Sequence, residues 1–155
     1  MAINSMNQPP LRHLARFISS GTFTIPEGAS RLYVSVNGAQ GVSSQGGTRG
    51  NSARGNGYVN VVPGKTAQII IGAGTSAGSG SQAGTTSFDG AIIVTGSSSG
   101  STGRYGAQSG SAGTVTAITS LPGGAPSGAA VRVTSTSSSS QDIGSAENGS
   151  VDIYG

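Results

Sequence analysis

The chain of 155 residues has no cysteine, no tryptophan and a single histidine, His13. Without cysteine it can form no disulfide framework, no thiolate metal site and no thiol nucleophile. One histidine leaves no histidine pair for a metal ion, so we expect no metal site. No apolar run approaches the ~18 residues of a transmembrane helix, and the N-terminus lacks the apolar region of a secretory signal peptide. We therefore expect no membrane partner.

Charged residues are also scarce, at 8%, and four leucines stand against eleven isoleucines and eleven valines. Leucine, glutamate and lysine favour helices, whereas β-branched residues favour strands. This bias excludes a helical bundle, a coiled coil and a large α/β enzyme. The net charge of +3 comes from eight scattered lysine and arginine residues. Such scatter is a weak signal for nucleic acid, so no nucleic-acid partner is expected.

Glycine, serine and proline, by contrast, make up 61 of the 155 residues. Such a composition is typical of disordered chains, but disorder also needs a high net charge, which is missing here. Short apolar runs are instead separated by Gly/Ser loops at 38–57, 72–84 and 96–113. Eight or nine short strands with no helix between them predict an all-β domain, either an antiparallel β-sandwich or a jelly-roll-like fold.

The expected strands follow from apolar alternation and from the turn residues that bound them. Leu32, Val34 and Val36 share one face of the clearest alternating run, and 67–71 is apolar enough for a buried strand. Pro26-Glu27-Gly28, Pro63-Gly64 and Asp89-Gly90 predict turns. The expected strands are 22–25 with the apolar pair 17–18 before it, 31–37, 58–62, 67–71, 85–88, 91–95, 114–121, 129–134 and 151–154.

Residues 1–16 differ from the remainder, and we predict that they form an extended arm joined to a glycine-rich domain at 17–155. The Pro-Pro pair favours an extended backbone, and 11–15 has the apolar spacing for one helical turn. Such an arm docks on a partner protein or stays mobile. The candidate anchoring residues are Pro9, Pro10, Leu11, Arg12, Leu14 and Arg16.

Several patterns resemble enzyme motifs without the residues that the chemistry needs. The glycines at 72–78 follow a strand, but the next residues cannot form the helix that would hold a pyrophosphate. Pro63-Gly64-Lys65-Thr66 lacks the earlier glycine of a phosphate-binding loop, because position 59 is valine. A nucleophilic serine would need His13, which lies in the arm. We predict no catalytic residue, no cofactor and no enzymatic activity.

Arginine and tyrosine side chains in the Gly-rich loops are the candidates for surface recognition. Both residue types are favoured at binding surfaces. In these loops they would contact a host glycan or a neighbouring protein; the alternative interpretation is that they are solvated charges that keep the loops soluble. The candidate residues are Arg49, Arg54, Arg104 and Tyr105.

A series of short motifs runs in order from about residue 20 to the end of the chain. It reads GTFTIPEG at 21–28, GYV at 57–59, VVPGKT at 61–66, IIIGAG at 69–74, GTTSFDG at 84–90 and GSVDIY at 149–154. This ordered set resembles the glycine-rich domain of bacteriophage tail-fibre and other virion surface proteins. The resemblance implies an all-β virion component and names no catalytic residue. Loops of that family often carry long uninterrupted glycine runs, whereas in this chain serine, alanine and glutamine lie between the glycines. This difference argues against packed polyglycine helices.

The expected function is that of a structural accessory protein of a bacteriophage virion. A capsid decoration or short head-fibre protein, docked by its arm on the major capsid protein or another virion protein, fits the short chain best. It would be made in the cytoplasm of the bacterial host and lie on the virion surface. Because the apolar core is small, we expect a homo-oligomer, with a trimer as the working model. The alternative is a tail-fibre tip or accessory that binds a host surface polysaccharide.

Overall fold

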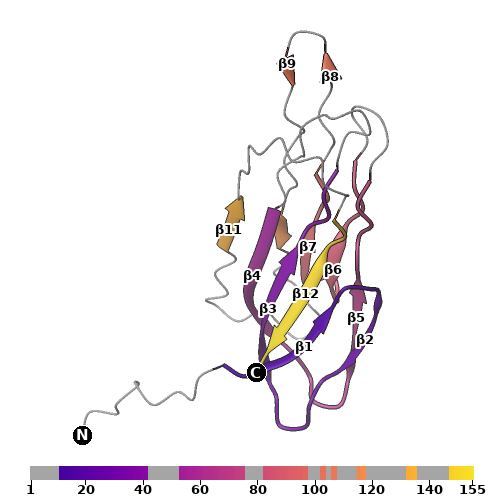
Figure 1. Cartoon of the computed structure of the whole chain (residues 1–155). Coiled ribbons are helices and arrows are strands. Elements are labelled where there is room, and N and C mark those ends of the chain that lie inside the picture. The colour runs from indigo at the N-terminus through magenta and orange to yellow at the C-terminus, as the bar shows by residue number, and fades with distance from the viewer. Residues whose placement is uncertain are drawn as a thin grey trace, which may run out of the picture.

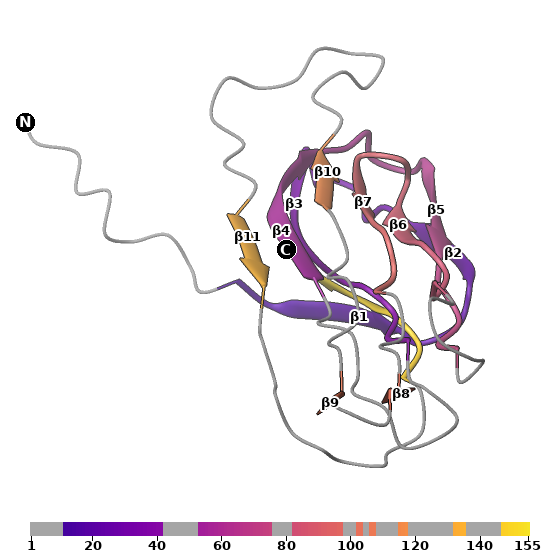
Figure 2. The ribbon, with the colours of Figure 1, turned by 90° about the horizontal axis from the view of Figure 1, so that it is seen from above.

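The computed structural model describes residues 11–41, 53–75, 82–97 and 147–155 with their side chains, and four short strands between 102 and 135 by their backbone alone. The described residues form strands and turns, with no helix. Two antiparallel sheets face each other as two layers (Figures 1 and 2). The all-β sandwich predicted from the sequence is confirmed.

Each layer is a five-stranded sheet that combines strands consecutive in sequence with strands far apart in sequence. Sheet A contains, in order, β1 (His13–Phe17), β12 (Ser150–Tyr154), β3 (Arg31–Asn37), β4 (Ala53–Asn60) and β11 (Arg132–Ser135). Sheet B contains β10 (Val115–Ala117), β7 (Ile92–Val94), β6 (Thr86–Phe88), β5 (Thr66–Ile70) and β2 (Gly21–Thr24). A separate hairpin pairs β8 (Thr102–Gly103) with β9 (Gly106–Ala107).

The core lies between the sheets and follows the alternation of the strands. Leu32, Val34 and Val36 of β3 are almost fully buried, as predicted. Phe88 of β6 supplies the largest fully buried side chain. The run 67–71 is not buried throughout, because β5 has the core on one face only and leaves Ile70 47% exposed. The apolar side chains of the core cluster are Ile25, Leu32, Val34, Val36, Ala53, Val59, Ala67, Ile69, Phe88, Ala91, Ile92, Val94, Val151 and Ile153.

Short turns connect the paired strands where the sequence predicts them. Asp89, Gly90 and Ala91 join β6 to β7, and Ala91 N donates to Phe88 O at 2.8 Å. The φ values of 46° at Asp89 and 67° at Gly90 have the positive sign that a type I′ turn requires at both central positions. Gly64 has φ 73° and follows Pro63, in a turn closed by Lys65 N donating to Val62 O at 3.2 Å. Positive φ at the third position of such a turn favours glycine.

Strand β4 begins at Ala53, well inside the segment 38–57 that we predicted to be a loop. Ala53, Gly55 and Gly57 face inward, and Arg54 and Asn56 alternate with them on the outer face. Small inward residues hide the apolar alternation from the sequence, yet pairing with β3 satisfies their backbone groups. The hairpin β8–β9 likewise lies in the predicted loop 96–113. The described residues contain twelve strands, where eight or nine were expected for the chain.

The last residues of the predicted arm belong to sheet A. The helical turn expected over 11–15 is wrong: β1 pairs with β12, with Ala15 opposite Ile153. Arg12 N donates to Gly155 O at 2.8 Å, and Gly155 N donates to Arg12 O at 2.9 Å. The backbone partners of β1 come from the edge of β12, which is far away in sequence, so the pattern of residues 11–15 alone does not predict this pairing. The anchoring candidates Pro9 and Pro10 lie outside the described residues.

Backbone contacts close the end of the sandwich that lies away from the C-terminus. We call the segments 38–41, 71–75, 82–85, 95–97 and 147–149 the closed end. Its cross-links include Gly149 N to Gly72 O at 2.9 Å, Gly84 N to Ala73 O at 2.8 Å, Ser97 N to Ala39 O at 3.0 Å and Thr75 N to Gln40 O at 3.1 Å. A Cβ added at Gly72 would collide with the carbonyl group of Gly84. The glycines allow these loops to pack backbone on backbone.

Candidate binding face on sheet A

The outer face of sheet A carries a row of four rings, here called the aromatic row. His13, Tyr154, Tyr33 and Tyr58 are directly opposite one another across β1, β12, β3 and β4. Their ring centroids are 5.1, 6.1 and 5.1 Å apart, in edge-on arrangements, the geometry that aromatic quadrupoles favour. The guanidinium carbon of Arg31 lies 4.3 Å from the centroid of Tyr58, which adds a cation–π contact.

Next to the aromatic row, Asp152 ties β1 to the rest of the sheet. Its Oδ1 lies 3.2 Å from His13 Nε2 and 3.9 Å from Arg16 Nε. The side chain of Asp152 is 15% exposed, whereas those of His13 and Arg16 are 48% and 62% exposed. Ion pairs with such exposed partners contribute little to stability. The contact between Asp152 and Arg16 mainly sets the position of the Arg16 side chain on the outer face of sheet A.

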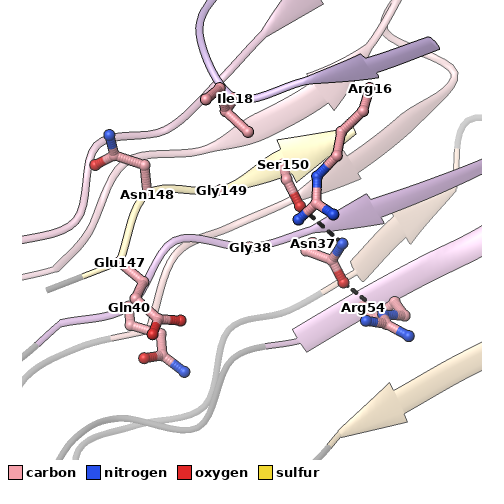
Figure 3. Close-up of a pocket in the computed structure, with 10 residues that line it drawn as sticks. All are labelled: Arg16, Ile18, Asn37, Gly38, Gln40, Arg54, Glu147, Asn148, Gly149 and Ser150. Atoms are coloured by element: carbon pink, nitrogen blue, oxygen red, sulfur yellow. Dashed lines mark hydrogen bonds between the residues drawn. The ribbon is translucent and has the colours of Figure 1, made fainter. Parts of the chain in front are cut away.

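An open pocket of about 480 Å³ begins where these strands reach the closed end (Figure 3). It is lined by Arg16, Ile18, Asn37, Gly38, Gln40, Arg54, Glu147, Asn148, Gly149 and Ser150. We call it the sheet A pocket. Its lining comes from β1, β3, β4, β12 and the closed end, so the pocket requires these four strands of sheet A to be paired.

A chain of hydrogen bonds crosses the floor of the sheet A pocket. Arg54 Nε donates to Asn37 Oδ1, and Asn37 Nδ2 donates to Ser150 Oγ at 2.9 Å. These three residues are direct neighbours in the register of β4, β3 and β12. The bond from Arg54 Nε orients the Arg54 side chain toward β3 in the absence of a ligand.

The pocket has a cationic end and a polar, acidic end. In Figure 3, Arg16 lies over the Asn37–Ser150 pair, Arg54 lies beside Asn37, and Glu147 lies beside Gln40 at the opposite end. Gln40 N donates to Glu147 O at 2.9 Å, which keeps those two segments together. Arginine recognises carboxylates and phosphates through paired N–H groups. The arrangement is therefore suited to bind a polar anion.

Two of the pocket residues were already candidates from the sequence, Arg16 for anchoring and Arg54 for surface recognition. Arg54 was expected in a loop but lies in β4, and Arg16 was expected in the arm but lies in β1. Leu11 and Leu14 are 47% and 37% exposed near the same edge. Three surface candidates, Arg49, Arg104 and Tyr105, lie outside the described residues.

Other pocket and face residues were missed, although part of the signal was present. The alternation of 31–37 already predicts that Tyr33, Ser35 and Asn37 point away from the core. What the pattern does not give is the strand order β12-β3-β4, which places Ser150 and Arg54 on either side of Asn37.

Searches for other kinds of site cover only the part of the chain that the structure describes. Within it, no group of three or more histidine and acidic side chains could hold a metal ion. No helix in those same ranges is long and apolar enough to cross a membrane. Comparisons of the chain with family models, curated proteins and solved structures find no match.

Proposed function

We propose that this chain is a structural accessory protein of a bacteriophage virion, a capsid decoration or short head-fibre protein. It is made in the bacterial host cytoplasm and docks on the major capsid protein, or another virion protein, through its N-terminal residues. The ordered motifs that resemble virion glycine-rich domains support this role. In the structure those motifs lie on strands and turns of one sandwich.

The single observation that carries the proposal is the position of β1. Its backbone pairs with β12 up to Arg12, which bonds to Gly155. The N-terminal residues therefore enter the sandwich beside the C-terminus, at the end away from the closed end (Figure 1). A partner that holds those residues would leave the closed end and the sheet A pocket facing away from the attachment.

Self-association is part of the same proposal, with a trimer as the working model. Leu11, Leu14 and Ile18 expose apolar surface near β1, with Ile18 68% exposed. Edge strands with exposed apolar residues favour pairing between chains. Sedimentation of the purified chain tests the oligomeric state.

Deletion of residues 1–10 is expected to abolish incorporation into particles and to leave the sandwich folded. The deletion stops at residue 10 because β1 begins at His13 and contributes to sheet A. Incorporation is measured by immunoblot of purified particles after the variant replaces the natural chain during infection, and folding by thermal unfolding.

Arg31→Gln in the full-length chain is the matched control, since it alters the outer face and keeps the N-terminal residues. It should be incorporated normally. Normal incorporation of the deletion variant as well would exclude residues 1–10 as the anchor.

A second role, a tail-fibre tip or accessory that binds a host surface polysaccharide, is favoured by one specific observation. The sheet A pocket is polar and carries charges of both signs near the closed end. A recognition site placed away from the attachment suits a receptor-binding protein. The copy number on the particle distinguishes this role from capsid decoration.

A further inference from the structure

We propose that the sheet A pocket binds a saccharide that carries a carboxylate. The carboxylate is held by Arg16 and Arg54, and the sugar hydroxyls reach toward Gln40 and Glu147. This site does not depend on capsid decoration, because a capsid decoration protein need not bind any sugar, and it specifies the ligand class of the polysaccharide-binding role.

The cationic end of the pocket is preorganised for one anionic group. Arg54 is oriented by Asn37, which is in turn bonded to Ser150. Arg16 approaches from β1, close to Asp152 but with its side chain 62% exposed. A guanidinium that is already in place loses less conformational entropy when it binds a carboxylate.

The lining of the pocket favours a saccharide over a protein partner. Protein interfaces are apolar or aromatic at their centre and depleted in charge there. Here Ile18 is the large apolar side chain, set at the rim and 68% exposed. Amide, hydroxyl and carboxylate groups make up most of the remaining side chains. Those groups match the donors and acceptors of a hydroxyl-rich ligand.

The charge pattern argues against nucleic acid as the ligand. Binding to a phosphate backbone requires several cations along a path, each of which displaces a counterion. The pocket has two arginines and places Glu147 at the opposite end, where it would repel a second phosphate. A volume of about 480 Å³ falls within the range of small-ligand sites, and an open shape allows one part of a longer glycan to enter.

The test uses the full chain and the probe galacturonate, which carries a single carboxylate, with galactose as the neutral control, followed by NMR titration of backbone amides. We expect galacturonate to shift the amides of Asn37, Ser150 and Arg54, and galactose to leave them unchanged. Arg54→Gln should weaken galacturonate binding roughly tenfold, since it removes a charge-assisted hydrogen-bond pair. Arg16→Gln, at an exposed side chain, should weaken it as well and tests the site if Arg54→Gln unfolds.

Arg31→Gln is the charge-matched control, because Arg31 lies on the same sheet face beside Tyr58 and outside the pocket. It should bind galacturonate like the natural chain. Three results would overturn the proposal: no binding of galacturonate at millimolar concentration, equal binding of an oligoglutamate peptide, or equal loss of affinity in Arg31→Gln and Arg54→Gln. None of them affects the count of copies on particles, so the two proposals fail separately.

Discussion

Replacement of Gly149 by alanine is expected to destabilise the sandwich by about 3 kcal/mol or more. Gly149 is buried immediately before β12, and its N–H donates to Gly72 O at 2.9 Å. An added Cβ would lie 2.7 Å from the carbonyl oxygen of Asn37 and closer still to Thr86 Oγ1. The carbonyl oxygen of Asn37 belongs to the backbone and cannot rotate away, so β3 or β12 would have to shift.

The matched control for this variant is Gly28→Ala. Gly28 has φ 86° and nothing within 4 Å of an added Cβ, so that variant measures the cost of the left-handed backbone alone, about 1 kcal/mol. Urea unfolding of both variants gives the two free energies. Equal losses in the two variants would mean that the closed end is not tightly packed around Gly149.

Phe88→Ala is expected to cost about 3–5 kcal/mol of unfolding free energy. Phe88 is fully buried in β6, opposite Ile69 on one side and Ile92 on the other. The core is small, and truncation leaves a cavity between the sheets that the short strands cannot close. Since domains of this size are stable by roughly 5–15 kcal/mol, the variant should sit near the limit of folding.

Phe23→Ala provides the comparison for Phe88→Ala. Phe23 lies on the edge strand β2, is only partly buried and contacts Phe17 with ring centroids 6.3 Å apart. Its loss should be clearly smaller in the same urea unfolding experiment. A similar loss for both phenylalanines would contradict a core centred between β6 and β3.

The success of sequence-based prediction here depended on whether the signal was local. The alternation of β3 and the Asp89-Gly90 turn were predictable, because both depend on neighbouring residues. The start of β4 was predicted at residue 58, after its true start at Ala53, because Gly55 and Gly57 occupy inward positions and carry no apolar side chain. Strand β1 was taken for an arm because its partner, β12, lies at the other end of the chain.

The candidate site shows the same division. Arg54 could be chosen from its residue type, but its role in the pocket depends on Asn37, 17 positions away, and on Ser150, 113 positions from Asn37. Only the strand order brings the three together. The high glycine content was interpreted as a sign of loops. In the structure it permits the close backbone packing of Gly72 and Gly149.

Two features lie at opposite ends of β12. The N-terminal residues enter beside Gly155, and the sheet A pocket lies beyond Ser150. Attachment at one end with recognition at the other would let many copies on one particle act together, and such multivalency raises the effective affinity of a weak site.

The measurement that tests the proposed virion role most directly is a count of this chain in purified particles by quantitative mass analysis. The account predicts hundreds of copies per particle, comparable to the major capsid protein. A few copies would move the chain to the tail or a unique vertex and favour the receptor-binding role over decoration. Absence of the chain from particles would contradict the account.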